Sequence, residues 1–347
     1  MGFIWFWIVA VMIAAYVVFD GFDLGVGILA PFLARTEEDR RAVLRSIGPV
    51  WDGNEVWLLA GGGTLYFAFP LLYASSFSGF YLPLMIVLWL LIGRGLSIEL
   101  RMHIDHTVWR SFFDGMFFVS SALLAIFFGA ALANVIRGVP LGADNYFFLP
   151  LWTNWRVSAQ PGILDWYTVI GGLVALIALA THGALWLVIK APGELETKAR
   201  RAASALWMVL LVITLISLPA TIAVRPAALV NYRAHPVLFA IPLLVVATLI
   251  GMLSFTRQRK PVAAFVSSCL YLVFMLVGAA AGLYPTLLPS SSDPARDITI
   301  ANSLTGSHSL HVGLVWWSLG LILALGYIFT SYFLFRGKVT AEAGYGH

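Results

Sequence analysis

The sequence contains few charged side chains: Lys, Arg, Asp and Glu make up 11% of its 347 residues. A soluble domain carries about a quarter, so this deficit excludes an ordinary soluble enzyme. Apolar runs of around 20 residues recur along the chain, and each is long enough to cross a bilayer as a helix. Because the runs are continuous rather than alternating, they predict an all-α polytopic membrane protein and exclude a β-barrel.

Cysteine is also scarce. Cys269 is the single cysteine, so no intrachain disulfide can form, and neither a CxxC nor a CxxCH motif occurs. The first residues, MGFIWFW, lack the basic region of a signal peptide. We therefore expect them to be retained in the first membrane helix.

The apolar runs predict nine spans in one transmembrane domain that occupies residues 1–347. The predicted spans are 3–33, 47–74, 79–100, 112–136, 166–189, 202–224, 237–256, 262–285 and 309–335. No connecting segment is long enough for a separate domain. The longest, about 137–165, carries tryptophans of the kind that lie at a lipid surface.

The basic residues predict the orientation of these spans. Of the 21 Lys and Arg side chains, 15 lie in the tail or in the loops that follow the first, third, fifth and seventh spans, and five lie in the alternate loops. Positive charge collects on the cytoplasmic side of membrane proteins. We therefore predict an N-terminus outside and a C-terminus in the cytoplasm of a bacterial inner membrane, and no nucleic-acid partner.

Carboxyl groups lie inside the first two spans. Asp20 and Asp23 are three residues apart in the first, and Asp52 and Glu55 are three apart in the second, so each pair shares a helix face. With a helix rise of about 1.5 Å per residue, Asp23, Asp52 and Glu55 fall in the cytoplasmic half of their spans. Short loops make the first three spans neighbours, so we expect these side chains to meet in one internal pocket.

The third span adds Arg94 and Glu99, which we interpret as charge-pairing residues. An isolated charge at the centre of a span costs roughly 2.5–3.5 kcal/mol, and pairing offsets part of this cost. One interpretation is a structural ion-pair cluster that pins three helices. The other is a proton path, because four carboxyls exceed what one arginine needs.

Small residues and a lone histidine complete the set of candidates. Gly21 and Gly25 form a small-xxx-small pair, which suits close packing against another helix. The run GGG at 61–63 suggests a second close approach. His182 has no histidine at its depth, so we expect a hydrogen-bonded helix contact rather than a haem ligand.

Several strings resemble subunit II of the cytochrome bd-type quinol oxidases, in the order of that family. They are DGFDLGVGIL at 20–29, WDGNEVWLLAGGGTLYFAFPLLYASSFSGFY at 51–81, GVPL at 138–141 and YPTLLPSS at 284–291. The GNEVW form and RGLSIELR at 94–101 are closer to the cyanide-insensitive branch.

The resemblance implies two four-helix bundles plus one peripheral helix, and no haem or metal bound by this chain alone. It also implies a haem-bearing partner, subunit I, with haem b and either haem d or a further haem b. We expect Trp57 to pack at the interface with that partner. Some members add a small accessory subunit and a structural quinone. The complex oxidises quinol and reduces oxygen to water, generating a proton-motive force without pumping.

Asp52 corresponds to the proton-channel aspartate of the family. The resemblance therefore implies that Asp52, helped by Asp20, Asp23 and Glu55, feeds cytoplasmic protons toward the oxygen-reducing haem of the partner. Glu55 stands where other members have Gln, and it either relays protons or only pairs with Arg94.

Two other classes of protein are alternatives to this interpretation. A proton-coupled secondary transporter predicts inverted repeats or broken helices near the midplane, which the sequence does not show convincingly. A scaffold that only stabilises a haem-bearing partner needs no proton path. A haem spectrum of the purified protein separates an oxidase from a transporter.

Overall fold

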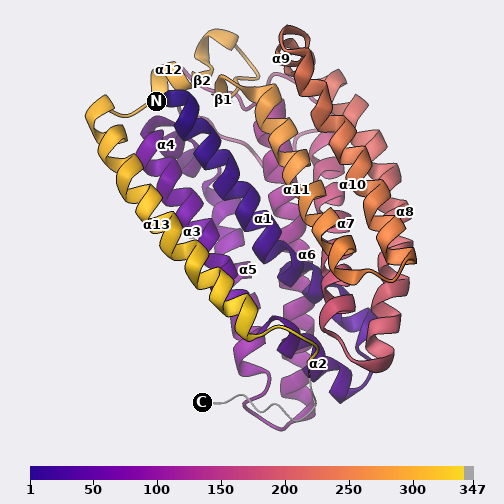
Figure 1. Ribbon diagram of the computed structural model, residues 1–347. Helices are drawn as coiled ribbons and strands as arrows, with labels where there is room; N and C mark the ends of the chain where they lie inside the picture. Colours follow the sequence, from indigo (N-terminus) through magenta and orange to yellow (C-terminus); the bar gives the residue numbers. More distant parts are fainter. Residues whose placement is uncertain (340–347) are drawn as a thin grey trace.

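The computed structural model describes residues 1–339 and confirms the all-α prediction (Figure 1). The long helices are α1 (Gly2–Leu33), α3 (Trp51–Ala68), α5 (Tyr81–Leu100), α6 (Thr107–Arg137), α7 (Trp166–Lys190), α8 (Gly193–Val224), α10 (Ala240–Arg257), α11 (Pro261–Leu283) and α13 (Ser307–Leu334). The short helices are α2 (Glu37–Ile47), α4 (Pro70–Gly79), α9 (Leu229–Ala234) and α12 (Ile300–Ser303). The 3₁₀ turns are η1 (Pro226–Ala228), η2 (Pro236–Phe239) and η3 (Pro294–Arg296).

A small antiparallel sheet lies between the last two long helices. Strands β1 (Thr286–Leu288) and β2 (Ile298–Thr299) pair with Thr286 opposite Thr299 and Leu288 opposite Ile298. The sheet therefore closes the connection from α11 to α13 at the end of the molecule where the chain begins (Figure 1).

Eight helices within residues 1–339 are long and apolar enough to cross a membrane. Each overlaps one predicted span. The remaining predicted span, 47–74, is wrong as a continuous helix. This range contains parts of three separate helices, namely the last residue of α2, all of α3 and the first residues of α4. Pro49 and Pro70 explain the breaks, because proline cannot donate the backbone hydrogen bond of a helix interior and is tolerated at a helix start.

The long helices form two contacting groups and one outlying helix. In the first group, α1 contacts α3 and α6, and α6 contacts α5. In the second group, α7 contacts α8 and α11, and α10 contacts α8 and α11. Contacts of α1 and α6 with α7 join the groups. α13 lies apart along the side of α3 and α4 (Figure 1).

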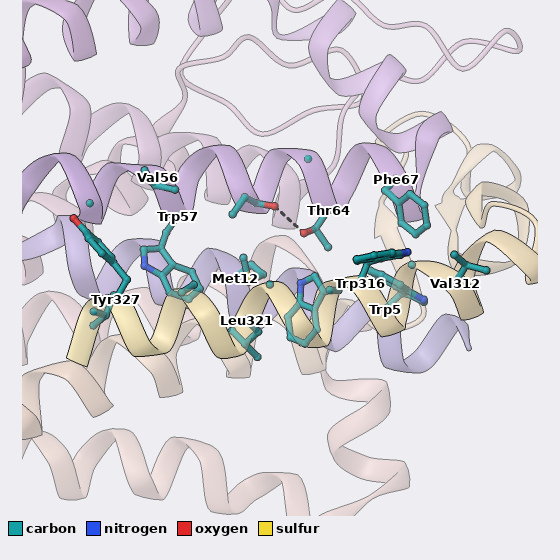
Figure 2. Close-up of a pocket in the computed structure, with 18 of the residues that line it drawn as sticks. Trp5, Met12, Val56, Trp57, Thr64, Phe67, Val312, Trp316, Leu321 and Tyr327 are labelled. Atoms are coloured by element: carbon teal, nitrogen blue, oxygen red, sulfur yellow. Dashed lines mark hydrogen bonds between the residues drawn. The ribbon is translucent and has the colours of Figure 1, made fainter. Parts of the chain in front are cut away.

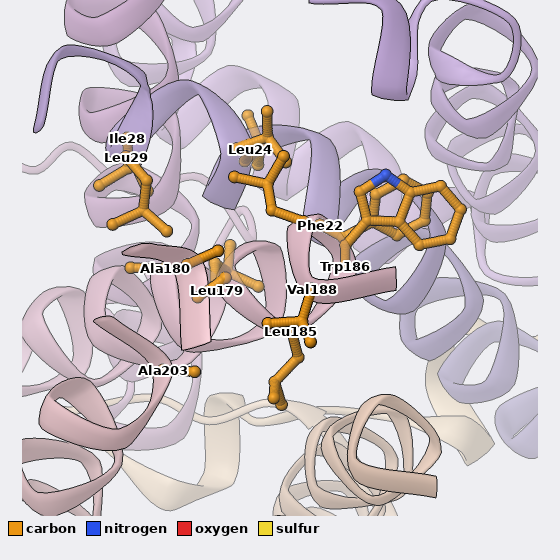
Figure 3. Packing of buried hydrophobic residues seen from close by; sticks show 14 of the residues in the cluster. Phe22, Leu24, Ile28, Leu29, Leu179, Ala180, Leu185, Trp186, Val188 and Ala203 are labelled. Carbon is orange, nitrogen blue, oxygen red and sulfur yellow. The ribbon is translucent and has the colours of Figure 1, made fainter. Parts of the chain in front are cut away.

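The buried apolar side chains form two clusters along α1. One surrounds the second half of α1 and includes Phe22, Leu24, Leu179 and Trp186, with Phe22 and Trp186 stacked at a centroid distance of 4.1 Å (Figure 3). The other surrounds the first half of α1 and reaches α3, α4 and the 138–165 segment. α1 is therefore the central helix against which both groups pack.

The 138–165 segment is fastened to the ends of α6 and α7 by a buried ion pair. Arg137 pairs with Asp165, and its guanidinium also donates to Asn134 Oδ1 at 2.6 Å and to Gly162 O at 3.1 Å. Trp152 and Trp155 in this segment are more than half exposed, as expected of side chains that lie at a lipid surface.

Glycines allow α1 and α7 to approach closely. A methyl group at Gly25 would lie 2.7 Å from Gly183 N and closer still to the Leu179 carbonyl oxygen, and one at Gly21 would lie 2.8 Å from a Leu179 methyl. This face of α1 therefore packs directly on α7. In the GGG run, Gly61 is buried with Met12 of α1 beside it, but a methyl group at Gly62 or Gly63 would meet no atom within 4 Å.

We predict that Gly25→Ala destabilises the protein by about 1–3 kcal/mol, the usual cost of overpacking, because backbone atoms of α7 have no room to retreat. Gly62→Ala is the matched control. It introduces the same group at an open helical position, where exchange of Gly for Ala gains up to about 1 kcal/mol. Thermal unfolding of the purified complex measures both effects, and equal unfolding temperatures for the two variants would contradict the packing argument.

Candidate functional site

Arg94 of α5 is the centre of a buried ionic cluster. Its Nη1 donates to Asp20 Oδ1 of α1 at 2.6 Å, and its Nη2 donates to Glu55 Oε2 of α3 at 3.2 Å. The side chains of Arg94 and Asp20 are fully buried, whereas Glu55 is 23% exposed. The structure therefore brings three predicted residues from three helices together.

Asp23 lies one turn further along α1 and has a different partner. Its Oδ2 accepts a hydrogen bond from Asn54 Nδ2 of α3 at 2.8 Å, and Asp23 and Asn54 are both buried. Asp23 therefore pairs with an amide rather than with a second guanidinium. Two carboxyls of α1 and one of α3 face a single arginine, so the cluster holds more acid than its one cation needs.

Some polar atoms of the cluster lack a partner among the described residues. They are Asp23 Oδ1 and Arg94 Nε, both with negligible exposed area, while the Tyr16 hydroxyl lies near enough to interact with the Asp20 carboxyl. Tyr16, Asp20 and Asp23 are spaced by four and three residues, so they follow one face of α1. Buried polar groups of this kind are normally bonded to internal water, and water between them would link the carboxyls.

Asp52 stands apart from this buried cluster. It is exposed, and it makes no hydrogen bond or ion pair with any residue in 1–339. It lies in the first turn of α3, where the helix dipole favours a negative charge. The predicted grouping of all four carboxyls in one internal pocket is therefore wrong for Asp52, because Asn54 rather than Asp52 faces α1.

Asp52 lines an apolar groove between α3 and α13 of about 870 Å³ (Figure 2). Trp57 lies on its wall, 6% exposed, and stacks on Phe19 at a centroid distance of 5.6 Å. The other large lining side chains are Trp5, Met12, Phe67, Trp316, Trp317, Leu321, Tyr327 and Ile328. Gly63 contributes to the open wall, whereas Gly61 is buried beside Met12 of α1.

Glu99 is not a partner of Arg94. Its Oε1 accepts a hydrogen bond from Trp51 Nε1 at 3.2 Å and it forms no ion pair within residues 1–339, so the prediction that Glu99 is a charge-pairing residue is wrong. Glu99 lies five residues beyond Arg94, and this spacing turns it to another side of α5.

A second ion-pair group lies where α2, α5 and α6 end or begin. Arg101 is buried and donates to Glu37 at 3.0 Å and to Asp114 at 2.5 Å. Hydrogen bonds from Arg101 lower the pKa of Glu37 to about 2. The stabilisation from this pair is therefore complete above the ordinary pKa of 4.5 and is lost only as the pH falls toward 2.

His182 of α7 makes hydrogen bonds through both ring nitrogens. Nδ1 lies 2.7 Å from Ser268 Oγ and Nε2 lies 3.0 Å from the Val18 carbonyl oxygen, and the ring stacks on Phe265. Neither nitrogen is directed at an open site. No cluster of three or more His, Cys, Asp or Glu side chains within residues 1–339 has the geometry of a metal site.

Sequence analysis missed Asn54, Tyr16 and Tyr332. Tyr332 of α13 donates to Asn54 Oδ1 at 2.9 Å and so extends the cluster to the outlying helix. Asn54 stands between Asp52 and Glu55 in a quoted motif, and its polarity in a membrane helix was the available signal. Tyr332 lies far from these residues in sequence, and no local pattern connects it to them.

The fold and the buried acidic cluster define a multi-pass helical membrane protein with ionisable groups held between helices. A sequence model of the family described as "Cytochrome bd terminal oxidase subunit II" matches residues 1–335. The chain belongs to this family, which confirms the resemblance seen in its motifs. The chain is a subunit of an oxidoreductase complex, and the description as subunit II implies a partner, subunit I.

Known relatives match along almost the entire chain. "Cytochrome bd-I ubiquinol oxidase subunit 2" of Escherichia coli strain K12 is 32% identical over 370 aligned positions, covering 99% of this chain and 96% of the relative. "Cytochrome bd ubiquinol oxidase subunit 2" of Bacillus subtilis strain 168 is 32% identical, covering 97% and 96%. A chain from the structure of bd oxidase from Geobacillus thermodenitrificans shares the fold, with a TM-score of 0.77, 17% identity and coverage of 96% and 98%.

Proposed function

We propose that this chain supplies a cytoplasmic proton path to the oxygen-reducing site of its partner subunit. The observation that carries the proposal is the buried group of Asp20, Asp23 and Glu55 around a single Arg94. A cluster that served only to pin helices would need one carboxyl for its one arginine. Ionisable side chains inside a membrane are costly and typically mark proton or ion pathways.

The arrangement supports a path with an internal and an external part. Asp20 and Asp23 are closed off from the surface, Glu55 is 23% exposed, and Asp52 is exposed on the groove side of α3. Glu55 contacts Arg94 on the inside and lies one turn from Asp52, so it connects the two parts. We assign Asp52 to proton transfer between this chain and the partner, with Glu55 as a relay rather than only an ion-pair partner.

We place the haem-bearing subunit I against the side of the molecule formed by α3 and α13. Large apolar side chains on α13 are widely exposed, among them Trp316, Leu323 and Phe329. Asp52 lies on the same side. We assign haem b, with haem d or a further haem b, to the partner, and the buried His182 has both ring nitrogens bonded within this chain.

The groove between α3 and α13 would hold a structural quinone. Its walls carry the indole rings of Trp5, Trp57, Trp316 and Trp317 on an otherwise apolar surface. Flat aromatic rings suit contact with a quinone head group, and the apolar length of the groove suits an isoprenoid tail. Such a quinone is structural in this proposal, and we assign quinol oxidation to the partner.

We further propose that α3 and α4 together make a ninth crossing in one transmembrane domain of two four-helix bundles plus α13. The bundles are α1, α3, α5 and α6, and α7, α8, α10 and α11. The distribution of Lys and Arg supports an N-terminus outside and a C-terminus in the cytoplasm of a bacterial inner membrane. The complex is then electrogenic without pumping, because its protons come from the inner side.

Sided proton uptake tests the proposed function. The complex is placed in vesicles, and the pH on each face is recorded with impermeant dyes during quinol-driven oxygen reduction. We expect protons for water formation to disappear from the face that carries the C-terminus of this chain. Uptake of these protons from the opposite face would contradict the proposal.

A further inference from the structure

A chain of side-chain hydrogen bonds connects α1, α3 and α13 next to the ionic cluster. Asn54 Nδ2 donates to Asp23 Oδ2 at 2.8 Å, and the Tyr332 hydroxyl donates to Asn54 Oδ1 at 2.9 Å. Asp23 has no exposed area and Asn54 is 1% exposed. The bond between Asp23 and Asn54 is therefore made away from bulk water, and the bond from Tyr332 is partly buried.

The two bonds together fix which way the Asn54 amide points. The ionised Asp23 carboxylate can only accept, so the Asn54 nitrogen faces it, and the amide oxygen is left to accept from the Tyr332 hydroxyl. Asp23 Oδ2 is thereby occupied as an acceptor, and Asp23 Oδ1 is left without a partner among the described residues. The carboxyl thus presents one defined oxygen for a proton.

Tyr332 is held in place by more than its hydroxyl. Its ring packs against Phe22 and Trp186 at centroid distances of 6.4 and 6.0 Å. The segment just beyond α13 is fastened to α7, because Lys190 Nζ donates to the Phe335 carbonyl oxygen and Val339 N donates to the Lys190 carbonyl oxygen at 2.9 Å. Exchange of Tyr332 for Phe should therefore remove one hydrogen bond and leave the ring where it is.

We propose that Asn54 and Tyr332 are positioning residues that hold the Asp23 carboxyl in one orientation and couple α13 to the proton path. The functional part rests on the proposed role of Asp23 in that path. Without the Tyr332 hydroxyl, the amide can turn over and place its oxygen against Asp23 Oδ2. Two acceptors then face each other, an arrangement that is stable only while Asp23 carries a proton. Asp23 would then take up and release its proton at a different pH than in the wild type.

The test uses Tyr332→Phe in the assembled complex, with Tyr271→Phe as the matched control. Tyr271 is also buried and its hydroxyl bonds to Thr214 Oγ1 at 2.7 Å, in the other helix group. Oxygen consumption is recorded against pH, and the Asp23 carboxyl band is followed by difference infrared spectroscopy and assigned by its loss in Asp23→Asn. We expect Tyr332→Phe to slow turnover about fivefold, the factor of one neutral hydrogen bond, to alter the pH profile and to shift the band.

Tyr271→Phe should leave the turnover, the pH profile and the band as in the wild type. If Tyr332→Phe fails to assemble, Asn54→Leu provides a second test, since it removes the donor to Asp23 without adding another carboxyl. A band and a pH profile equal to those of the Tyr271→Phe complex overturn the inference. If instead Asp23→Asn keeps wild-type turnover while Tyr332→Phe still shifts the band, the positioning stands and the proton path through Asp23 fails.

Discussion

Arg94→Met is expected to abolish most of the stably assembled complex. The substitution removes the only cation that contacts Asp20 within the described residues and leaves that carboxyl fully buried. Breaking a buried ion pair on one side costs about 3–5 kcal/mol, because the remaining charge has no compensation. A loss of this size is a large part of the stability of a folded domain. The yield of complex and its thermal unfolding measure the effect.

Two further variants separate charge from packing at this position. Arg40→Met removes a guanidinium from Asp114 at a pair in which the arginine side chain is 40% exposed, so it should cost no more than about 1 kcal/mol. Arg94→Met combined with Asp20→Leu removes both charges and should recover much of the lost assembly. If the double variant assembles no better than Arg94→Met alone, the uncompensated Asp20 charge is not the cause.

Asp52→Asn is expected to assemble normally and to lower quinol-driven oxygen consumption at least about tenfold, since positioned proton-transfer groups contribute typically 10²–10⁴-fold. Asp52 has no hydrogen bond or ion pair within residues 1–339, so its removal should cost little stability. Asp52→Leu should act in the same way, because both variants lack a group that exchanges protons. Asp52→Glu should retain part of the activity.

Asp105→Asn is the matched control for this prediction. Asp105 is also acidic and its side chain is 88% exposed, but it pairs with Arg110 away from the buried cluster. It should keep wild-type turnover. Wild-type turnover in both Asp52→Asn and Asp52→Leu would remove Asp52 from the proton path, and loss of assembly in both would favour a structural role.

Most of the helical architecture could be predicted from the sequence. A long apolar run in lipid must form a helix, because a helix satisfies its own backbone hydrogen bonds. The predicted spans therefore agree with eight helices to within a few residues, except at the start of α8. The break at Pro49 was missed, because the hydropathy of a window does not register a single proline, whereas Pro70 lies inside the apolar run and could be seen to interrupt it. α8 begins at Gly193, before its predicted span, because its charged first turns continue the helix outside the apolar part.

The candidate site was predicted only in part. Helical spacing correctly indicated that Asp20 and Asp23 share a face and that Arg94 is near them, since short loops make the first helices neighbours. The spacing did not indicate the rotation of α3 about its axis. That rotation turns Asn54 toward α1 and Asp52 toward the groove, and it depends on contacts with Phe19 and α13. Tyr332 could not be linked to Asp23 without the fold.

Single-turnover proton uptake tests the central claim most directly. Fully reduced complex is mixed with oxygen, and haem oxidation and proton uptake are recorded together in the wild type and in Asp52→Asn. The account predicts that oxygen binds at the wild-type rate in both, while the phases that take up protons slow together in the variant. Proton uptake at the wild-type rate in Asp52→Asn would contradict it.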